Sequence, residues 1–351
     1  MGAGRTDTGA FVNLFQQALA GRPLDTPPIW VMRQAGRYQA SYRRLRRRHA
    51  FETLCREPEL AARVALDAVR AFDFDAAIVF SDLLFPLEAL GFGLSYDTGP
   101  PVLDGRLTPG RLRRFRATEA ALERLAFQSG AVAATRAGLP AEKGLIGFVG
   151  GPWTLFVYAV EGSHAGSLMR AKRAPGLYRA FARRVVPLLR RLIRAQLAAG
   201  ADLVMIFDTA AGELSASEFG PTLASDLRAL ASASPGRVGY YARGLHPDHL
   251  RHPHMAGIPW AGLGLDGRWA LAGALACRPG PGFVQGNFDQ ALLHLESRAL
   301  ARAIDRFVEP VLRLPRRARC GWICGLGHGV LPGTPETNVH QFIRRIRRMT
   351  A

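Results

Sequence analysis

Short apolar segments alternate along the chain with longer stretches in which apolar residues recur every three or four positions. The short segments predict strands at residues 29–32, 76–80, 145–149, 203–207, 238–242, 261–265, 283–285 and 321–324. The longer stretches predict helices, most clearly at residues 58–71, 119–137, 177–199, 217–231, 291–313 and 336–348. Ser217 and Asp289 are predicted to cap helices, and Gly200 to end one.

The predicted strands are almost continuously apolar, as in strands that helices cover on both faces. Eight strand and helix units in 351 residues favour an α/β fold, a single (β/α)8 TIM barrel over residues 1–351 with its active site at the C-terminal ends of the strands. A doubly wound open sheet is the alternative. That fold usually carries a glycine-rich phosphate loop after its first strand, and this sequence has none there.

Polar or small residues follow every predicted strand, at the end of a barrel that carries function. In chain order they are Arg33 with Arg37, Ser81-Asp82, Gly150-Gly151, Asp208-Thr209, Arg243-Gly244, Asp266, Asn287 and Gly327-His328-Gly329. Strand ends are often polar for other reasons, so each position has to be weighed by its chemistry.

Arg33 and Arg37 follow the first predicted strand, four positions apart. A guanidinium is always charged, and its planar fork of donors fits a carboxylate with two hydrogen bonds. Two of them around the Ala35-Gly36 pair indicate a pocket for a substrate with several carboxylates. The alternative is a pair of solvated arginines in an arginine-rich chain.

Asp82 and His328 are the other candidates with distinctive surroundings. Asp82 lies between apolar residues, where a carboxylate is costly to bury without a partner, so it either caps or pairs with an arginine, or it accepts ligand N–H groups and stabilises a developing cation. His328 lies between glycines that let the backbone approach a ligand and adopt positive φ. It is either an exposed loop residue or a group that hydrogen-bonds a substrate.

Tyr158 and Thr209 complete the set of candidate residues. Tyr158 is placed on a helix after the third predicted strand, where a tyrosine is either core or a substrate contact. Thr209 could bind a carboxylate through its hydroxyl, and the neighbouring Asp208 has equal claims as a helix cap and as a ligand contact.

The formal net charge of +18 raises the question of nucleic-acid binding. Of 46 basic residues only Lys143 and Lys172 are lysines, which leaves 44 arginines. The arginines occur in short clusters that alternate with Leu, Ile or Val in predicted helices, a pattern typical of solvated helix faces. We therefore expect no specific nucleic-acid partner. The other explanation for the high net charge is a lineage whose proteins are generally rich in arginine.

Other signals exclude several classes of protein. No apolar run reaches the roughly 20 residues of a membrane span, so we expect a cytoplasmic enzyme without a membrane partner. Cys320 and Cys324 have three residues between them and no accompanying His pair, which predicts no metal site. All four cysteines are expected to be reduced and mostly buried. The chain lacks a P-loop, a GxSxG elbow and an HExxH motif. What remains indicates cofactor-free chemistry on a polyanion.

Over nearly its whole length the sequence resembles the uroporphyrinogen decarboxylase family. The most specific motifs are PIWVMRQAGRY at residues 28–38 and FDFDAAIVFSD at residues 72–82. They are followed in the expected order by Gly151-Pro152-Trp153-Thr154, Tyr158, Glu161-Gly162, Phe207-Asp208-Thr209, Gln285-Gly286-Asn287 and Leu326-Gly327-His328-Gly329.

The resemblance implies a (β/α)8 barrel, a homodimer, and no metal or organic cofactor. It also implies the conversion of uroporphyrinogen III, which has eight carboxylates, into coproporphyrinogen III by decarboxylation of four acetate side chains in haem biosynthesis. The implied catalytic residues are Asp82, Arg33 and Arg37, with one arginine relaying a proton. The implied substrate-binding residues are Arg33, Gln34, Ala35, Gly36, Arg37, Asp82, Tyr158, Thr209 and His328.

The chain departs from the family pattern at four positions. Family members commonly have Trp at the positions of Ala210 and Gly267, Asn at that of Gly325, and Lys at that of Arg243. The alternative is therefore a diverged barrel that binds tetrapyrroles or transfers methyl groups. A corrinoid-dependent methyltransferase would need a zinc thiolate site near the fifth strand, where the sequence reads Tyr240-Tyr241-Ala242-Arg243.

Overall fold

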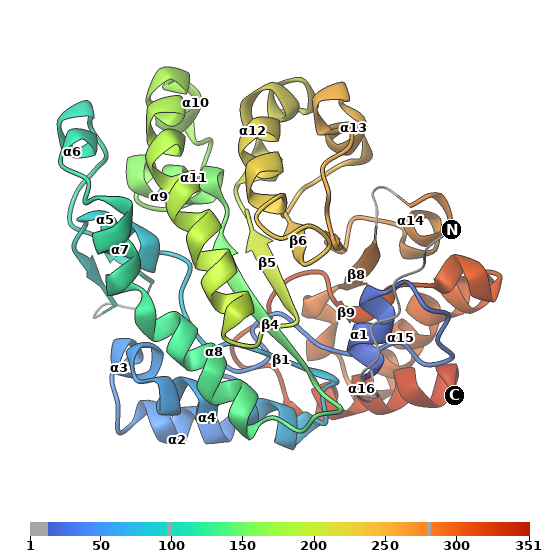
Figure 1. Ribbon diagram of the computed structural model, residues 1–351. Helices are drawn as coiled ribbons and strands as arrows, with labels where there is room; N and C mark the ends of the chain where they lie inside the picture. The colour runs from blue at the N-terminus through green and yellow to red at the C-terminus, as the bar shows by residue number, and fades with distance from the viewer. Residues whose placement is uncertain (1–12, 97–99, 279–281) are drawn as a thin grey trace, which may run out of the picture.

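The computed structural model describes residues 13–96, 100–278 and 282–351. Parallel strands form one curved sheet, in the order β1-β4-β5-β6-β7-β8-β9, and helices surround it (Figure 1). The strands are β1 (Ala76–Ile78), β4 (Gly144–Gly150), β5 (Leu203–Phe207), β6 (Val238–Tyr241), β7 (Gly262–Gly264), β8 (Phe283–Phe288) and β9 (Trp322–Leu326), with a separate antiparallel pair of β2 (Leu94–Ser95) and β3 (Val102–Leu103). Seven of the eight predicted strands are thus confirmed.

The first predicted strand, residues 29–32, is wrong as a regular strand: it makes a single parallel bridge, from Ile29 to Cys324. Residues 29–32, the closing segment, nevertheless complete the barrel between β9 and β1. Cys324 N–H donates to the Pro28 carbonyl at 2.9 Å, and Asp75 N–H donates to the Ile29 carbonyl at 2.8 Å. The Ile29 N–H is taken by the Asp75 side chain at 2.8 Å, so a regular ladder cannot continue there.

The helices cover the sheet as the periodicity predicts, with two interruptions. They are α1 (Leu14–Leu19), α2 (Ala40–Arg46), α3 (Phe51–Arg56), α4 (Pro58–Phe72), α5 (Phe85–Leu90), α6 (Pro109–Arg113), α7 (Thr118–Arg124), α8 (Ala126–Gly138), α9 (Pro152–Glu161), α10 (Met169–Lys172), α11 (Pro175–Ala198), α12 (Ala216–Ala231), α13 (Pro247–Arg251), α14 (Leu271–Cys277), α15 (Ser297–Leu312) and α16 (Glu336–Thr350). Short 3-10 turns are η1 (Ala211–Glu213), η2 (Pro253–Met255), η3 (Gln290–His294) and η4 (Arg316–Arg319). The stretch 119–137 is divided between α7 and α8, and the stretch 291–313 between η3 and α15.

Helix ends test three of the predictions. Gly200 follows α11 with φ 109°, a conformation that suits glycine, so its role as a helix stop is confirmed. Asp289 accepts the Ala291 N–H at 2.9 Å and caps the 3-10 turn η3. The prediction for Ser217 is wrong, because Ser215 forms the capping box of α12 with Glu218.

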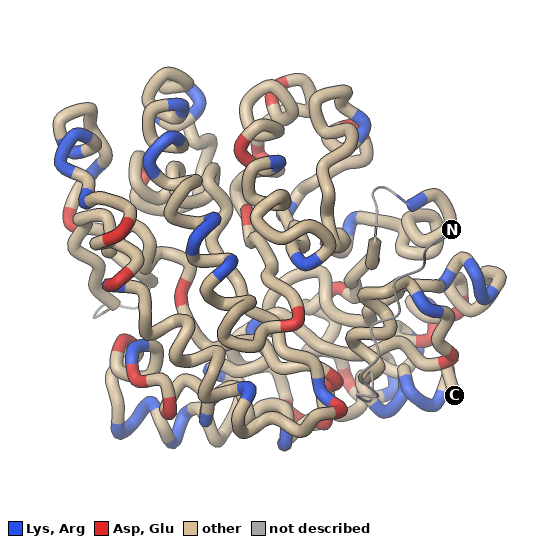
Figure 2. The backbone as a smooth tube through the Cα atoms, viewed as in Figure 1, with Lys and Arg blue, Asp and Glu red and all other residues tan. Residues whose placement is uncertain are grey.

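The basic residues lie on helices and loops on several sides of the molecule (Figure 2). This distribution agrees with the solvated helix faces predicted from the sequence. Among the described residues, no helix is long and apolar enough to cross a membrane. Of the four free cysteines, Cys55 and Cys324 are buried, whereas Cys277 is exposed, so the expectation of mostly buried thiols holds for only half of them.

Candidate active site

The site begins with Arg33, in the loop that follows the closing segment. Arg33 has φ 58°, a left-handed conformation that is uncommon for a residue with a side chain. Its side chain lies across Gly329, since a Cβ built on Gly329 would come within 2.5 Å of the Arg33 Cδ. The Val330 N–H donates to the Met32 carbonyl at 2.9 Å and joins the two loops. The loop after β9 therefore fixes the position of Arg33 at the mouth of the barrel, which is the end where the strands have their C-termini.

The residues after Arg33 mostly hold this loop in place. Gln34 is fully buried. Its side-chain amide donates to the Ala76 carbonyl at 3.1 Å, and its backbone carbonyl accepts a hydrogen bond from the Tyr38 hydroxyl at 2.6 Å. Ala35 packs against the apolar cluster of Tyr42, Leu45, Leu54 and Val64. Gln34 thus acts as an internal brace in this loop.

Arg37, in the same loop, is exposed to solvent. Its charge lowers the pKa of Tyr42, although burial raises the pKa of that phenol overall. Among the described residues, Arg33, Arg37 and Arg243 form no ion pair with a carboxylate. Three unpaired guanidiniums are therefore available for an anionic ligand.

Asp82 follows β1 and is half-buried at the mouth. Its carboxylate accepts the Leu84 N–H at 2.8 Å just before α5 begins. Burial raises the pKa of Asp82, while the Leu84 N–H, the Tyr96 phenol and the charge of Arg33 all oppose that rise. The Tyr96 hydroxyl makes no hydrogen bond of ordinary geometry, yet it lies near enough to favour the ionised carboxylate. Asp82 is thus a desolvated carboxylate whose charge is supported from three directions.

Tyr158 projects from α9 toward Asp82. Its pKa is raised to about 12, first by burial and then by the charge of Asp82, while Arg33 lowers it. The structure therefore brings Tyr158, Asp82 and Arg33 together, as the sequence predicts for residues after successive strands. The Tyr158 hydroxyl lies 2.6 Å from Nδ1 of His164.

His328 lies in the loop after β9 and stacks on Tyr241, with ring centres 6.0 Å apart. The Tyr241 hydroxyl donates to the Gly327 carbonyl at 2.8 Å and lies 3.0 Å from Nδ1 of His328. Because the phenol proton goes to that carbonyl, the geometry assigns a proton to Nδ1 and leaves Nε2 as an acceptor. Burial, Arg33 and Arg243 lower the pKa of His328 to about 4, so the imidazole is neutral at pH 7.

The glycines around His328 serve close backbone packing. The sequence-based expectation of positive φ is wrong for Gly327 and Gly329, neither of which has it. A Cβ on Gly327 would lie 2.4 Å from the Gly267 nitrogen. These glycines bring the loops after β7 and β9 and the Arg33 side chain into contact.

Asp266 ties the remaining loops together. The buried carboxylate accepts the Gly244 N–H at 2.6 Å and the Arg268 N–H at 3.0 Å, and it forms an ion pair with the Arg268 guanidinium at 3.0 Å. The Asn287 amide donates to the Asp266 carbonyl at 2.6 Å. Asn287 lies within β8, so this strand and Asp266 together position the loops after β6 and β7.

Of the two open interpretations of Asp208, the structure supports the cap. Its fully buried carboxylate accepts the Thr154 N–H at 2.7 Å, in the first turn of α9, and the Tyr240 hydroxyl at 3.4 Å. A Cβ on Gly151 would lie 2.2 Å from the Asp208 Cγ, which explains the glycine there. The neighbouring Thr209 is half-buried at the strand end.

Three residues of the site were missed by reasoning from the sequence: Tyr96, His164 and Tyr241. Tyr241 is the last residue of β6, so the strand-end rule could have found it. His164 follows the helix stop at Gly162 by two residues, but only the path of the loop brings it to Tyr158. Among the described residues, no group of three His, Cys, Asp or Glu side chains is arranged to hold a metal ion.

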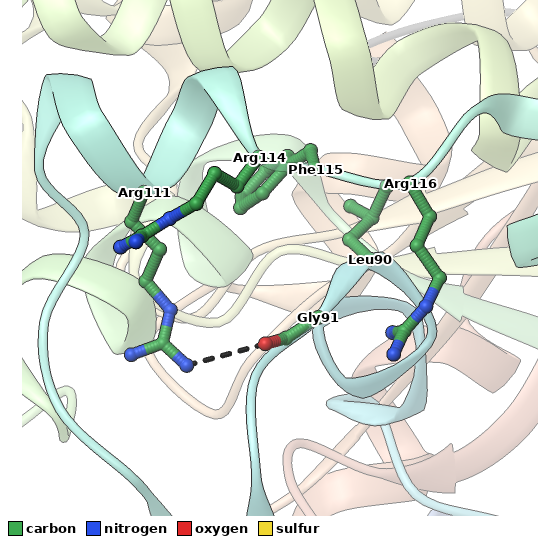
Figure 3. A pocket seen from close by; sticks show the side chains of 6 residues that line it. All are labelled: Leu90, Gly91, Arg111, Arg114, Phe115 and Arg116. Atoms are coloured by element: carbon green, nitrogen blue, oxygen red, sulfur yellow. Dashed lines mark hydrogen bonds between the residues drawn. The ribbon is translucent and has the colours of Figure 1, made fainter.

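A pocket of about 410 Å³ lies outside this cluster, at the C-terminal end of α5 (Figure 3). Arg111 donates to the Gly91 carbonyl at 3.2 Å, and Arg116 donates to the carbonyls of Glu88 and Ala89 at 3.3 and 3.2 Å. These guanidiniums bind the carbonyls that a helix leaves free at its end. We therefore assign this pocket to the packing of arginines around the end of α5. The candidate active site remains the cluster around Arg33 and Asp82.

Known proteins were compared with the chain by sequence and by structure. The family model described as "Uroporphyrinogen decarboxylase (URO-D)" matches residues 12–349. A uroporphyrinogen decarboxylase of Synechococcus sp. (strain JA-2-3B'a(2-13)) is 35% identical over 344 residues, which cover 95% of this chain and 96% of that protein. One of Thermus thermophilus is 33% identical, with 97% and 98% covered. A solved methyltransferase from Methanosarcina mazei has a TM-score of 0.78 over 97% of this chain and 100% of its own, at 20% identity, which shows a shared fold.

Proposed function

Because the chain belongs to the uroporphyrinogen decarboxylase family, a family of carboxy-lyases, we propose that it decarboxylates the four acetate side chains of uroporphyrinogen III and releases coproporphyrinogen III. The reaction needs no metal or organic cofactor in this proposal. The observation that supports it most is the position of Asp82, a desolvated carboxylate beside the unpaired Arg33 and the Tyr158 phenol. That arrangement offers one negative charge for a cation and positive charges for carboxylates.

The chemistry explains why one carboxylate is needed. A proton first adds to a pyrrole ring, which becomes cationic and can accept electrons. The bond between the acetate methylene and its carboxylate then breaks, its electron pair moves into the ring, and carbon dioxide leaves. A proton then adds to the methylene carbon to give the methyl group, and the ring loses the first proton. Asp82 stabilises the cationic ring, most strongly because it is desolvated, and accepts the pyrrole N–H groups.

The other residues have binding roles in this proposal. Arg33 and Arg37 hold acetate or propionate carboxylates, and one of them relays the proton. Tyr158 and Thr209 donate hydroxyl hydrogen bonds, and the neutral His328 offers Nε2 to the substrate. In the loop from Gln34 to Gly36, the backbone and the small side chain of Ala35 border the substrate while the Gln34 side chain supports the loop from behind.

The departures from the family pattern bear on how tightly the substrate is held. A Cβ on Gly325 would lie 2.4 Å from the Trp30 carbonyl oxygen, so in this chain the position requires glycine. A Cβ on Gly267 would have the Asn287 carbonyl oxygen at 3.6 Å, so this position has room for a small side chain. Arg243 is exposed at the mouth and keeps a positive charge where the family commonly has lysine.

The test is anaerobic incubation with uroporphyrinogen III, with the products resolved by their number of carboxylates. Wild-type protein should give products with seven down to four carboxylates. Asp82→Asn should lower kcat by about 100-fold or more while the fold is kept, the scale of losing one preorganised electrostatic contact. Asp248→Asn, which changes a carboxylate exposed at 61% of its area, serves as the matched control.

Two outcomes would count against the proposal. Unchanged turnover in Asp82→Asn would refute the role of that residue. Tetrapyrrole binding without any decarboxylation by well-folded wild type would favour the alternative of a diverged binding protein. The proposal also includes a homodimer in the cytoplasm, and sedimentation equilibrium would test the dimer.

A further inference from the structure

His164 lies beside the site in the segment that follows α9. The chain turns at Gly162, where φ is 84°, and the imidazole then packs against Tyr158, with ring centres 5.4 Å apart at 52°. Nδ1 of His164 lies 2.6 Å from the Tyr158 hydroxyl. This contact places a second imidazole at the mouth, next to a residue that the proposed reaction uses.

The charges around His164 come from several elements. Arg33 faces it from the first loop and Arg243 from the loop after β6, and both lower its pKa in addition to the effect of burial. Glu213 in η1 opposes them. His328, from the loop after β9, is also close enough for the two imidazoles to interact. Without a ligand, the surroundings of His164 are dominated by positive charge.

A bound carboxylate would reverse that balance. An anion within about 4–6 Å favours the charged form of a titratable group, and a carboxylate between Arg33 and Arg243 would also offset their effect on His164. An imidazolium carries protons on both ring nitrogens, so Nδ1 would donate to the Tyr158 oxygen. The Tyr158 proton would then be available to a carboxylate oxygen of the ligand.

We propose that His164 is a further binding residue of this site, which takes up a proton from solvent when a carboxylate of the substrate docks beside Arg33 and Arg243. The site thereby gains a positive charge only when it is occupied. The inference rests on the proposed function for the identity of the substrate, but the coupling itself requires only a polycarboxylate. The same step turns Tyr158 into a donor toward that carboxylate.

The first experiment is independent of catalysis. The His164 ring is followed by NMR between pH 5 and 8, with citrate as a non-reacting tricarboxylate probe and with His164→Gln to assign the signal. In free protein His164 should titrate below its ordinary pKa of 6.5, and saturating citrate should raise that pKa by about one unit or more. His254, exposed in η2, should not respond. A His164 pKa that citrate leaves unchanged would overturn the proposal.

The second experiment uses the proposed substrate. His164→Gln keeps a hydrogen-bonding partner for Tyr158 but cannot become charged, so its KM for uroporphyrinogen III at pH 6.5 should rise about tenfold, with kcat within about twofold of wild type. The difference in KM should shrink toward pH 8, and His254→Gln should match wild type throughout. Equal KM values for His164→Gln and wild type would contradict the proposal. If wild type decarboxylates nothing, the proposed function fails, and the citrate titration still decides the role of His164.

Discussion

Replacing Asp208 with asparagine should remove a pH dependence of stability that the wild type has between about pH 4 and pH 6. The carboxyl is fully buried, and burial raises its pKa from 3.8 to about 6. Hydrogen bonds from Thr154 and Tyr240 favour the ionised form but do not offset the burial. The folded protein therefore binds a proton at Asp208 over a pH range in which the unfolded chain has lost it.

The sign and size of the effect follow from linkage. With a pKa higher in the folded state, the stability from Asp208 is fully present below pH 3.8 and is lost as the pH rises to about 6. One pKa unit corresponds to about 1.4 kcal/mol, so the free energy of unfolding falls by about 3 kcal/mol across this window. Above it the group is ionised in both states, and its contribution stays constant.

Urea unfolding of wild type and Asp208→Asn at a series of pH values from 4 to 7.5 tests this reasoning. Asparagine can still accept the Thr154 N–H, and its amide can donate to the Tyr240 oxygen after the hydroxyl rotates. Relative to wild type, the variant should gain about 2–3 kcal/mol between pH 4 and pH 6.5. Asp248→Asn is the exposed control. A stability difference between Asp208→Asn and wild type that stays constant over this range would refute the argument.

Two other substitutions test opposite ends of the barrel. Gly329→Ala should displace Arg33, because the Arg33 Cδ would lie 2.5 Å from the new Cβ, and it should raise KM about tenfold with little change in Tm. In the control Gly273→Ala, the new Cβ would meet nothing closer than 4.0 Å, and neither KM nor Tm should change. An unchanged KM in Gly329→Ala would mean that Arg33 does not hold substrate. Arg347→Ala should lower the free energy of unfolding by about 1–3 kcal/mol, because the buried Asp75 carboxylate, 3.3 Å from the Arg347 guanidinium, loses a partner. The kcat at low temperature should stay unchanged. An unchanged Tm in calorimetry would contradict this prediction.

The strands of the parallel sheet were predictable because nearly every residue in them is buried, so a continuous apolar segment is sufficient to locate them. The short strands β2 and β3 are only partly buried and were not predicted. The strand prediction for the closing segment was wrong because of a residue outside that segment. Its Ile29 N–H is bound by the Asp75 side chain, a contact between residues 46 positions apart. Whether an apolar segment becomes a regular strand therefore depended on a side chain elsewhere.

Helix boundaries failed through local competition. Two predicted helices are broken although their apolar periodicity continues, because the chain turns at Leu125 and Leu295. Periodicity reports which face is buried and is insensitive to a change of direction between two helices that bury the same face. The cap of α12 moved from Ser217 to Ser215 because Ser215 has Glu218 three residues later, which completes a capping box.

For the active site, the strand-end rule found the residues and missed their contacts. Arg33, Asp82, Tyr158 and His328 converge, as expected of residues at the C-terminal ends of barrel strands. Tyr241, which fixes the proton on His328, was missed because it was counted within the apolar segment 238–242 and the strand end was placed at Arg243. Its stacking on His328 has no counterpart in the sequence pattern. Loop residues depend on the path of the backbone, which neither periodicity nor spacing encodes.

The two ends of β1 show how one barrel divides its charges between stability and binding. At its N-terminal side Asp75 is buried and lies within ion-pair distance of Lys143 and Arg347, so its charge is used within the fold. Beyond its C-terminal end Asp82 has a supporting N–H and the charge of Arg33 but no ion pair among the described residues. A charge that is already paired within the fold contributes little more to a ligand, so the charges proposed to act on the substrate, on Asp82 and Arg33, must be left without an ion-pair partner in the free protein. A carboxylate introduced next to Arg33 would therefore cost binding even if it stabilised the fold.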